Sequence, residues 1–271
     1  MERASSVYGT IDVGMLSRLS GLPAERVSFA VDQLEKKGLV GSRRLSYYMR
    51  QEAAEAMALR EYVKRDLIAA LGAIIAKGKE SDVYEAFTEE GSLYALKFYK
   101  LGRTSFTSVR KKRFREGVNM KSWIAVNYEA ARREYTALKR LEGISPAFPR
   151  AYSFSRSTIL LEELSGFRLS ERPQLENPMS TLLSLLESVR KAYMKSGLVN
   201  ADLSEYNILT DGNSVWIIDW PQAVEKTHPN SAELLMHDVT SVVKFFRRAY
   251  VVEMSVDRAY RFVTGEVAAL E

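Results

Sequence analysis

The sequence contains no cysteine and only two histidines, His228 and His237. Without thiols the chain forms no disulfide and no thiolate metal site; this suits a reducing cytosol, so we expect a cytoplasmic protein. Two histidines are too few for a histidine-rich metal centre, and we interpret both as structural or surface residues. No run reaches the roughly 20 apolar residues that a membrane span needs, and residues 1–6 show no apolar secretory signal.

The positive charge of the chain is concentrated in one segment. The 271 residues carry a net charge of +5 and 46% of them are hydrophobic, which indicates a globular protein with room for two domains. Residues 100–115 contain no acid, so they predict a solvated, flexible loop that would also bind phosphates or an RNA backbone. The cations of this basic segment are Lys100, Arg103, Arg110, Lys111, Lys112, Arg113 and Arg115.

Residues 1–70 have the element order of a winged helix-turn-helix domain. Apolar residues at helical spacing predict a first helix around 13–19 and a second over 23–37, with Pro23 at its first position. Two short strands are expected in 39–49, around a turn at residues 41–44, and a further helix over 51–71. Helix, turn, helix and hairpin in this order are typical of winged helices.

Two interpretations of this N-terminal domain remain open. In one, the helix over residues 25–37 enters a nucleic-acid groove, with Arg43 and Arg44 on the wing. In the other, the domain is a compact docking module that touches no base, because acids interrupt the basic residues of the helix. These acids are Glu25, Asp32 and Glu35.

The stretch from Asn200 to Leu209 carries the strongest chemical signal. Asp202 and Asn207 are separated by four residues, and Asp219 follows an apolar strand further along the chain. Phosphoryl transfer from a nucleotide needs one carboxylate to orient the nucleophile, and an amide and a second carboxylate to hold Mg²⁺. This spacing alone is a weak signal, because Asp and Asn are common loop residues.

Upstream segments supply the partners that this chemistry needs. Gly78 stands between two expected strands, where a glycine lets the backbone approach phosphates, and Ser81 can donate to a phosphate oxygen. Lys97 lies in an apolar strand and needs a partner there, unless it extends to water from an edge strand. Its spacing to Glu134, on a helix expected over 127–141, fits the lysine–glutamate pair of protein kinases.

The remaining pattern predicts an α+β fold with two lobes after the winged helix. The β-rich N-lobe covers 71–164, with a hairpin over 74–100, the basic flexible loop at 101–122 and a strand at 158–161. The helical C-lobe covers 165–271, with a helix over 178–195, a hairpin around the Asp219 strand and helices from 232 onwards.

With these residues in this order, the chain resembles a RIO-type atypical serine/threonine protein kinase. The segments 78–84 (GKESDVY) and 201–207 (ADLSEYN) are close to signatures of that family. The N-terminal winged helix, with segments 101–106 and 219–222, resembles the second RIO subfamily. The match covers nearly the whole chain, and its compact form, without a long C-terminal tail, resembles archaeal members.

The resemblance implies ATP with Mg²⁺ or Mn²⁺ as cofactors and gives each site residue a role. Asp202 would be the catalytic aspartate, with Lys97 on the α- and β-phosphates, and Asn207 and Asp219 would bind the metal. Asp238 would brace the catalytic loop from below. The nucleotide-binding set would be Gly78, Lys79, Glu80, Ser81, Lys97, Glu134, Leu161, Glu162 and Leu164.

Three positions depart from the family pattern. Asn200 replaces a structural histidine two residues before the catalytic Asp, and it can still donate a hydrogen bond. Ala76 stands where a first loop glycine is common, and Trp220 replaces a phenylalanine after the metal-binding Asp. The A-P-E phrase and the peptide platform of ordinary kinases are also missing from the 52 residues after Asp219.

The family implies an enzyme that phosphorylates itself or hydrolyses ATP during maturation of the small ribosomal subunit. Its partners would be pre-ribosomal RNA or ribosomal proteins, with no membrane. We expect autophosphorylation at Ser105, Thr107 or Ser108. Two alternatives remain: an ATP-sensing, nucleic-acid-binding regulator with little catalysis, and a small-molecule phosphotransferase.

Overall fold

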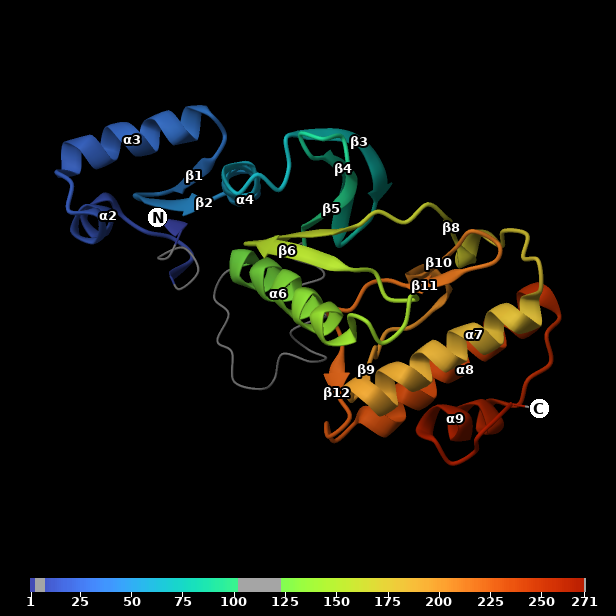
Figure 1. Cartoon of the computed structure of the whole chain (residues 1–271). Coiled ribbons are helices and arrows are strands. Elements are labelled where there is room, and N and C mark those ends of the chain that lie inside the picture. The colour runs from blue at the N-terminus through green and yellow to red at the C-terminus, as the bar shows by residue number, and fades with distance from the viewer. Residues whose placement is uncertain (3–7, 102–122, 271) are drawn as a thin grey trace. The chain divides into compact units, whose positions relative to one another are not determined.

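The computed structural model describes residues 1–2, 8–101 and 123–270 (Figure 1). The chain divides into two compact units, one of residues 1–132 with 153–160 and one of 133–152 with 161–271. Most of the basic segment, with the three expected phosphorylation sites Ser105, Thr107 and Ser108, lies outside the described residues. The three-domain division drawn from the sequence stays a prediction.

The first unit begins with a small module of helices and one hairpin. Its elements are α2 (Val13–Ser20), α3 (Ala24–Lys36), β1 (Val40–Arg43), β2 (Ser46–Met49) and α4 (Gln51–Lys64). This order agrees with the sequence prediction. The Asp12 side chain caps α2 by accepting the Met15 N–H at 2.7 Å. The apolar core of the module is Ile11, Leu16, Val27, Val31 and Val40.

The hairpin turn lies further along the chain than the sequence predicts. Gly41 belongs to β1, opposite Tyr48 of β2, and the chain reverses at Arg44 and Leu45. A Cβ on Gly41 would lie 2.4 Å from the Tyr48 ring, so this glycine is needed for close packing rather than for a turn. Arg44 takes the left-handed conformation of the turn instead, with a φ of 57°.

Helix α4 ends at Lys64, whereas the sequence predicts a helix to Leu71. The chain leaves the helix because Asp66 has a φ of 52° and the Leu67 N–H returns to the Tyr62 carbonyl. This reversal places Ile68 in an apolar core and frees the next residues to form a strand.

A five-stranded sheet follows, in the order β3-β4-β5-β7-β6. The strands are β3 (Ala70–Lys77), β4 (Ser81–Phe87), β5 (Leu93–Tyr99), β6 (Ala151–Ser155) and β7 (Thr158–Glu162). The pairing of β4 with β5 around Gly91 confirms the predicted hairpin. In the first unit, α4 packs on this sheet through Ala58 and Tyr62, and the Tyr62 hydroxyl lies 3.0 Å from Thr158 Oγ1. Burial raises the pKa of Tyr62 above its ordinary value.

Helix α6 (Trp123–Leu141) precedes β6, and the second unit is mainly helical. Helices α7 (Pro178–Lys191) and α8 (Ser231–Tyr250) lie side by side, and α9 (Val256–Thr264) packs on both (Figure 1). The predicted helix over 178–195 passes into a π turn, Ala192–Ser196, which ends at Gly197 with a φ of 67°. No described helix combines the length and the apolarity that a membrane crossing needs.

Short strands of the second unit carry the loops that matter for the site. They are β8 (Phe167–Arg168), β9 (Leu198–Val199), β10 (Ile208–Thr210), β11 (Val215–Ile217) and β12 (Val224–Glu225). Strand β10 pairs with β11 and β8, and β12 pairs with β9. Two short 3₁₀ turns, Leu169–Glu171 and Glu205–Asn207, complete this region.

Replacing Leu96 by Ala should strongly destabilise the first unit. Leu96 is fully buried in the cluster under α4, so truncation leaves a cavity and costs about 2–5 kcal/mol. Urea unfolding followed by Trp and Tyr fluorescence measures the change. Leu45→Ala is the control, because Leu45 is 88% exposed at the hairpin turn; equal losses in both variants would contradict this description of the core.

Candidate active site

A buried carboxylate holds the loop that contains Asp202. Asp238 of α8 is 1% exposed, and its two oxygens accept the N–H groups of Ala201 at 2.7 Å and Leu203 at 3.0 Å. Ala201 has a φ of 68°, so the loop reverses sharply between these two bonds. The side chain of Asp202, between them, is exposed. The structure thus places Asp238 where the sequence predicts a brace for this loop.

Asn207 is fixed at the other end of the same loop. Its side-chain Nδ2 donates to the Asp202 carbonyl at 2.9 Å, and its own carbonyl accepts the Ile218 N–H at 2.9 Å. The first bond uses the nitrogen of the amide and leaves its oxygen, Oδ1, available. No described residue donates to that oxygen. An amide oxygen held in this way is a suitable ligand for Mg²⁺.

The hairpin of β10 and β11 places Asp219 beside this loop. The Asp211 carboxylate accepts the N–H groups of Ser214 and Asn213 in the turn, and these bonds hold the pKa of Asp211 below its ordinary value. Asp219, just after β11, has a φ of 68°, and its carbonyl accepts Asn200 Nδ2 at 3.1 Å. The hairpin therefore ends in a sharp bend at the carboxylate.

Asn200 does two things that the sequence did not reveal. Its Nδ2 donates to the Asp219 carbonyl, and its Oδ1 accepts the Asp202 N–H at 3.2 Å. One buried amide thus connects the backbone of both predicted site carboxylates. An amide has a donor and an acceptor at fixed geometry, so asparagine can perform this role in place of the expected histidine.

Glu134 has a contact that sequence reasoning missed. This α6 residue is 1% exposed, and its Oε1 accepts the Trp220 N–H at 3.2 Å. The Trp220 indole is buried, donates to the Ile217 carbonyl at 2.9 Å and meets the Phe148 ring edge-on at 5.5 Å. No local pattern in the sequence indicates this contact, because α6 and the Asp219 bend are 86 residues apart. Lys97 belongs to the other compact unit, so its pairing with Glu134 stays a prediction.

The first unit holds Lys97 inside the sheet. Lys97 lies on β5 opposite Val83 of β4 and is only 7% exposed. Its ammonium group lies 4.9 Å from the centre of the Tyr99 ring, a cation–π distance. A lysine at this position is therefore a buried cation, and not the edge-strand lysine of the alternative interpretation.

The loop before β4 is a tight turn between β3 and β4. The Gly78 N–H donates to the Ser81 carbonyl at 2.9 Å, and a Cβ on Gly78 would lie only 3.0 Å from that oxygen. Lys79 and Glu80 are exposed at its tip, and the Glu80 carbonyl accepts the Lys100 N–H at 2.9 Å. Gly78 is thus required for the close approach of the two strands.

The end of β7 and the residues after it contain three members of the predicted nucleotide-binding set. Leu161 and Glu162 end the strand, and Leu164 follows as a half-buried residue. The Glu162 N–H donates to the Arg150 carbonyl at 2.8 Å, while the Glu162 carboxylate accepts the Arg150 N–H at 3.0 Å. The Glu162 N–H is therefore engaged, which leaves its carbonyl as the backbone group for the predicted contact.

The donor set suits a metal that is shared with phosphate. Within the described ranges, no group of three or more His, Asp or Glu could hold a metal ion. Mg²⁺ is commonly held by one or two protein oxygens together with substrate phosphates. The Asn207 amide oxygen and the Asp219 carboxylate have the chemistry for that arrangement.

Comparison with known proteins identifies the family. Residues 82–259 match the RIO domain. The RIO-type serine/threonine-protein kinase Rio2 of Methanocaldococcus jannaschii is 34% identical over 260 residues, which are 91% of this chain and 95% of that protein. The serine/threonine-protein kinase RIO2 of Caenorhabditis elegans is 28% identical over 92% of this chain, which spans 48% of that longer protein.

Solved structures agree with the sequence relatives. The crystal structure of the Rio2 kinase from Chaetomium thermophilum superposes with a TM-score of 0.78 at 25% identity, covering 98% of this chain and 83% of that chain. A second structure of that protein, an ADP/Mg²⁺-phosphoaspartate complex, gives 0.77 at 24% identity, with 97% and 84% covered. The mixed α/β fold is thus that of Rio2 structures. The chain belongs to the RIO family of serine/threonine protein kinases, within its Rio2 subfamily.

Proposed function

We propose that this protein is an ATP- and Mg²⁺-dependent kinase in which Asp202, Asn207 and Asp219 perform the phosphoryl-transfer chemistry. Asp202 orients the nucleophile and accepts its proton, while the Asn207 amide oxygen and the Asp219 carboxylate bind Mg²⁺. The observation that carries the proposal is the hydrogen bonding of the loops. Asn207 Nδ2 donates to the Asp202 carbonyl, and the Ile218 N–H donates to the Asn207 carbonyl, so the protein's own hydrogen bonds join the loops that carry the three polar side chains.

The first unit supplies the phosphate-binding groups of this proposal. Lys97 neutralises charge on the α- and β-phosphates of the same ATP, and Ser81 donates to a phosphate oxygen. Because Gly78 has no side chain, the turn leaves room for phosphates to approach its backbone. Glu134 orients Lys97, and the segment from Leu161 to Leu164 receives the adenine. Mg²⁺ supplies charge neutralisation on the phosphate oxygens when it is bound.

The region after Asp219 favours self-phosphorylation or ATP hydrolysis over the phosphorylation of many peptides. Only residues 220–230 connect Asp219 to helix α8, and they include the short strand β12. An ordinary protein kinase uses this region for an activation segment and a peptide-docking platform. A short connection leaves no room for that platform, so the enzyme acts on a bound assembly or on itself.

We further propose that the N-terminal module is a winged helix and that the protein acts in maturation of the small ribosomal subunit. Arg43 at the end of β1 and Arg44 in the turn that follows are both exposed, as on a wing. The basic segment from Lys100 to Arg115 adds a concentration of positive charge that suits ribosomal RNA.

The first test follows the γ-phosphate of labelled ATP in the presence of Mg²⁺. Wild type should transfer label to itself or release it, and Asp219→Ala should reduce turnover about 100-fold or more, because metal-held charge stabilisation is lost. Asp202→Ala should lose turnover while still binding ATP. Acid-stable label indicates Ser or Thr phosphate, hydroxylamine-labile label indicates an acyl phosphate, and free label indicates hydrolysis.

The same assay, run with and without small ribosomal subunits, separates the alternatives. Wild type with no turnover under either condition would favour the ATP sensor over the kinase. Unchanged turnover in Asp219→Ala would refute the metal assignment. Asp211→Ala is a matched control, because this exposed carboxylate caps the adjacent β10–β11 turn outside the proposed site.

Asn200→Ala should separate positioning from binding. Loss of the bonds to the Asp219 carbonyl and the Asp202 N–H should lower kcat about 10- to 100-fold by misplacing both carboxylates, with little change in the KM for ATP. Asn200→His, which restores a ring donor, should recover part of the rate. A variant whose kcat is unchanged would show that these two bonds are not needed for the reaction.

Affinity for ribosomal RNA should depend steeply on salt. If the basic segment makes about four phosphate contacts, affinity should fall about 50- to 150-fold between about 50 and 200 mM salt. Replacing Lys111, Lys112 and Arg113 by Ala should flatten the slope, and the Arg43/Arg44→Ala pair tests the wing separately. Filter binding over a salt series measures both, and a flat wild-type profile would remove the basic segment from the interface.

A further inference from the structure

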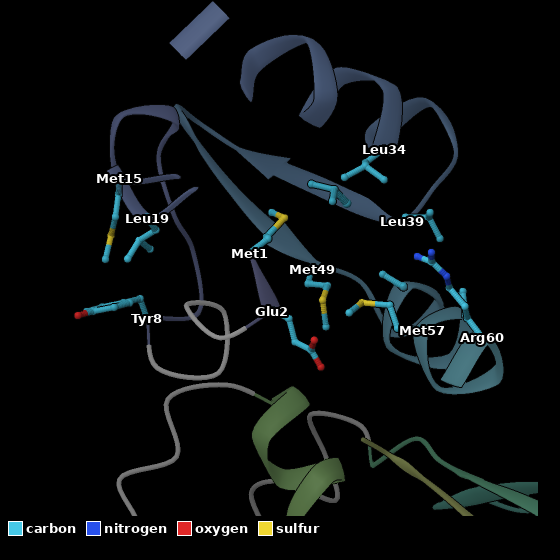
Figure 2. A pocket seen from close by; sticks show the side chains of 13 residues that line it. Met1, Glu2, Tyr8, Met15, Leu19, Leu34, Leu39, Met49, Met57 and Arg60 are labelled. Atoms are coloured by element: carbon cyan, nitrogen blue, oxygen red, sulfur yellow. The ribbon is translucent and has the colours of Figure 1, made fainter. Parts of the chain in front are cut away.

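A pocket of about 770 Å³ opens in the N-terminal module of the first unit, where α2, the end of α3 and the hairpin face helix α4 (Figure 2). Val40 and Met49 of the hairpin and Ala53 of α4 are buried at its base. Leu34 and Leu39 line it at the end of α3, and Met15 and Leu19 of α2 line the opposite side. The volume is within the usual range of roughly 300–1,000 Å³ for binding pockets, and the lining is mainly apolar.

The composition of the lining is unusual for this chain. Four of its nine methionines, at positions 1, 15, 49 and 57, line this one pocket. Methionine is unbranched and polarisable, so a surface made of it adapts to the shape of an apolar partner. A methionine concentration of this kind is typical of surfaces that bind amphipathic helices.

Two leucines on the apolar faces of α2 and α3 are exposed at this pocket. Leu19 and Leu34 continue the apolar faces of α2 and α3, yet Leu19 is 62% exposed and Leu34 is 36% exposed. The core of the module uses the neighbouring Leu16 and Val31 instead. The helical pattern therefore contains more apolar surface than the described fold covers, and the excess faces the pocket.

Helix α4 provides one wall of the pocket, and its lining residues have helical spacing. Ala53, Ala56, Met57 and Arg60 all line the pocket, at positions i, i+3, i+4 and i+7 of the helix. Ala56 is exposed and has almost no side chain, so a second helix can approach closely at this point. Ridges of a partner helix can pack between such positions.

The charge at the rim favours an acidic group. Glu2 is already engaged, since its carboxylate pairs with the Arg156 guanidinium at 2.7 Å and accepts the Tyr128 hydroxyl at 3.0 Å. The Arg60 guanidinium is exposed at the rim, and in the part of the chain that the structure describes it makes no hydrogen bond or ion pair. The remaining charge at the pocket is therefore positive.

We propose that this pocket binds an amphipathic α-helix of a protein partner. Apolar side chains of that helix, at spacing i, i+3 or i+4, and i+7, fill the space between α4 and the two exposed leucines. An acidic residue on the same face pairs with Arg60. This site is separate from the phosphoryl-transfer chemistry and does not depend on the proposed function.

The probe is a synthetic helical peptide with Leu at positions i, i+3, i+4 and i+7 and a Glu one turn further along the same face. The full chain, labelled with ¹³C in the methionine methyl groups, is titrated with it and followed by NMR. The signals of Met15, Met49 and Met57 should shift in a saturable way. Those of Met179, Met194 and Met236, which do not line the pocket, should stay in place. No shift at millimolar peptide, or equal shifts throughout, would overturn the proposal.

Charge reversal tests the pairing with Arg60. Arg60→Glu should weaken binding of the Glu peptide about threefold to tenfold, the size expected of a partly exposed ion pair, and a Lys peptide should restore it. Leu45→Glu, at the exposed hairpin turn outside the pocket, is the matched control and should bind as wild type does.

A blocking variant and a small ligand complete the test. Met57→Glu places a charge inside the pocket and should abolish the methionine shifts, while an unchanged thermal midpoint shows that the variant folds. Decanoate tests the other occupant, a small apolar carboxylate. Shifts with decanoate and none with the peptide would show a small-molecule pocket and overturn the helix proposal, as would peptide binding that Arg60→Glu and Met57→Glu leave unchanged.

Discussion

The hydrogen bonds from the Ala201 and Leu203 N–H groups to the buried Asp238 carboxylate are the constraint on which the proposed site depends. A carboxylate removed from water is costly unless donors surround it, so these bonds are needed by the core of the second unit and not only by a ligand. The loop must bend at Ala201 for both N–H groups to reach the Asp238 carboxylate, and that bend exposes Asp202. The geometry of the proposed catalytic group thus follows from the packing of helix α8.

Further hydrogen bonds connect the Asp202 loop to the Asp219 bend, and that bend to α6. Asn200 joins the Asp202 N–H to the Asp219 carbonyl, and Glu134 accepts the next N–H along the chain, that of Trp220. Every one of these bonds lies in the second compact unit. The loops are therefore shaped before a nucleotide arrives, and binding energy is not required to order them. In the first unit, Lys97 is likewise buried, within strand β5.

Sequence patterns predicted those parts of the structure that depend on neighbours along the chain. Alternating residues located the β4–β5 hairpin, and the spacing of Asp202, Asn207 and Asp219 located two loops that the structure joins by hydrogen bonds. Predictions failed where a side chain outside the local pattern decides the outcome. Gly41 looks like a turn residue, but the Tyr48 ring opposite it makes it a strand residue. The acceptor for the Trp220 N–H comes from α6, and no local pattern contains that information.

The exposed leucines of the N-terminal module show what such patterns measure. Periodic apolar residues indicate that a helix face needs cover, and they do not say whether the same chain provides it. Leu16 of α2 and Val31 of α3 are covered by the module's own core, whereas Leu19 and Leu34 on the same two helices are not. Exposed apolar residues at helical spacing therefore draw attention to a surface, because contiguous apolar side chains beside an open, methionine-lined pocket are typical of a site on which something packs.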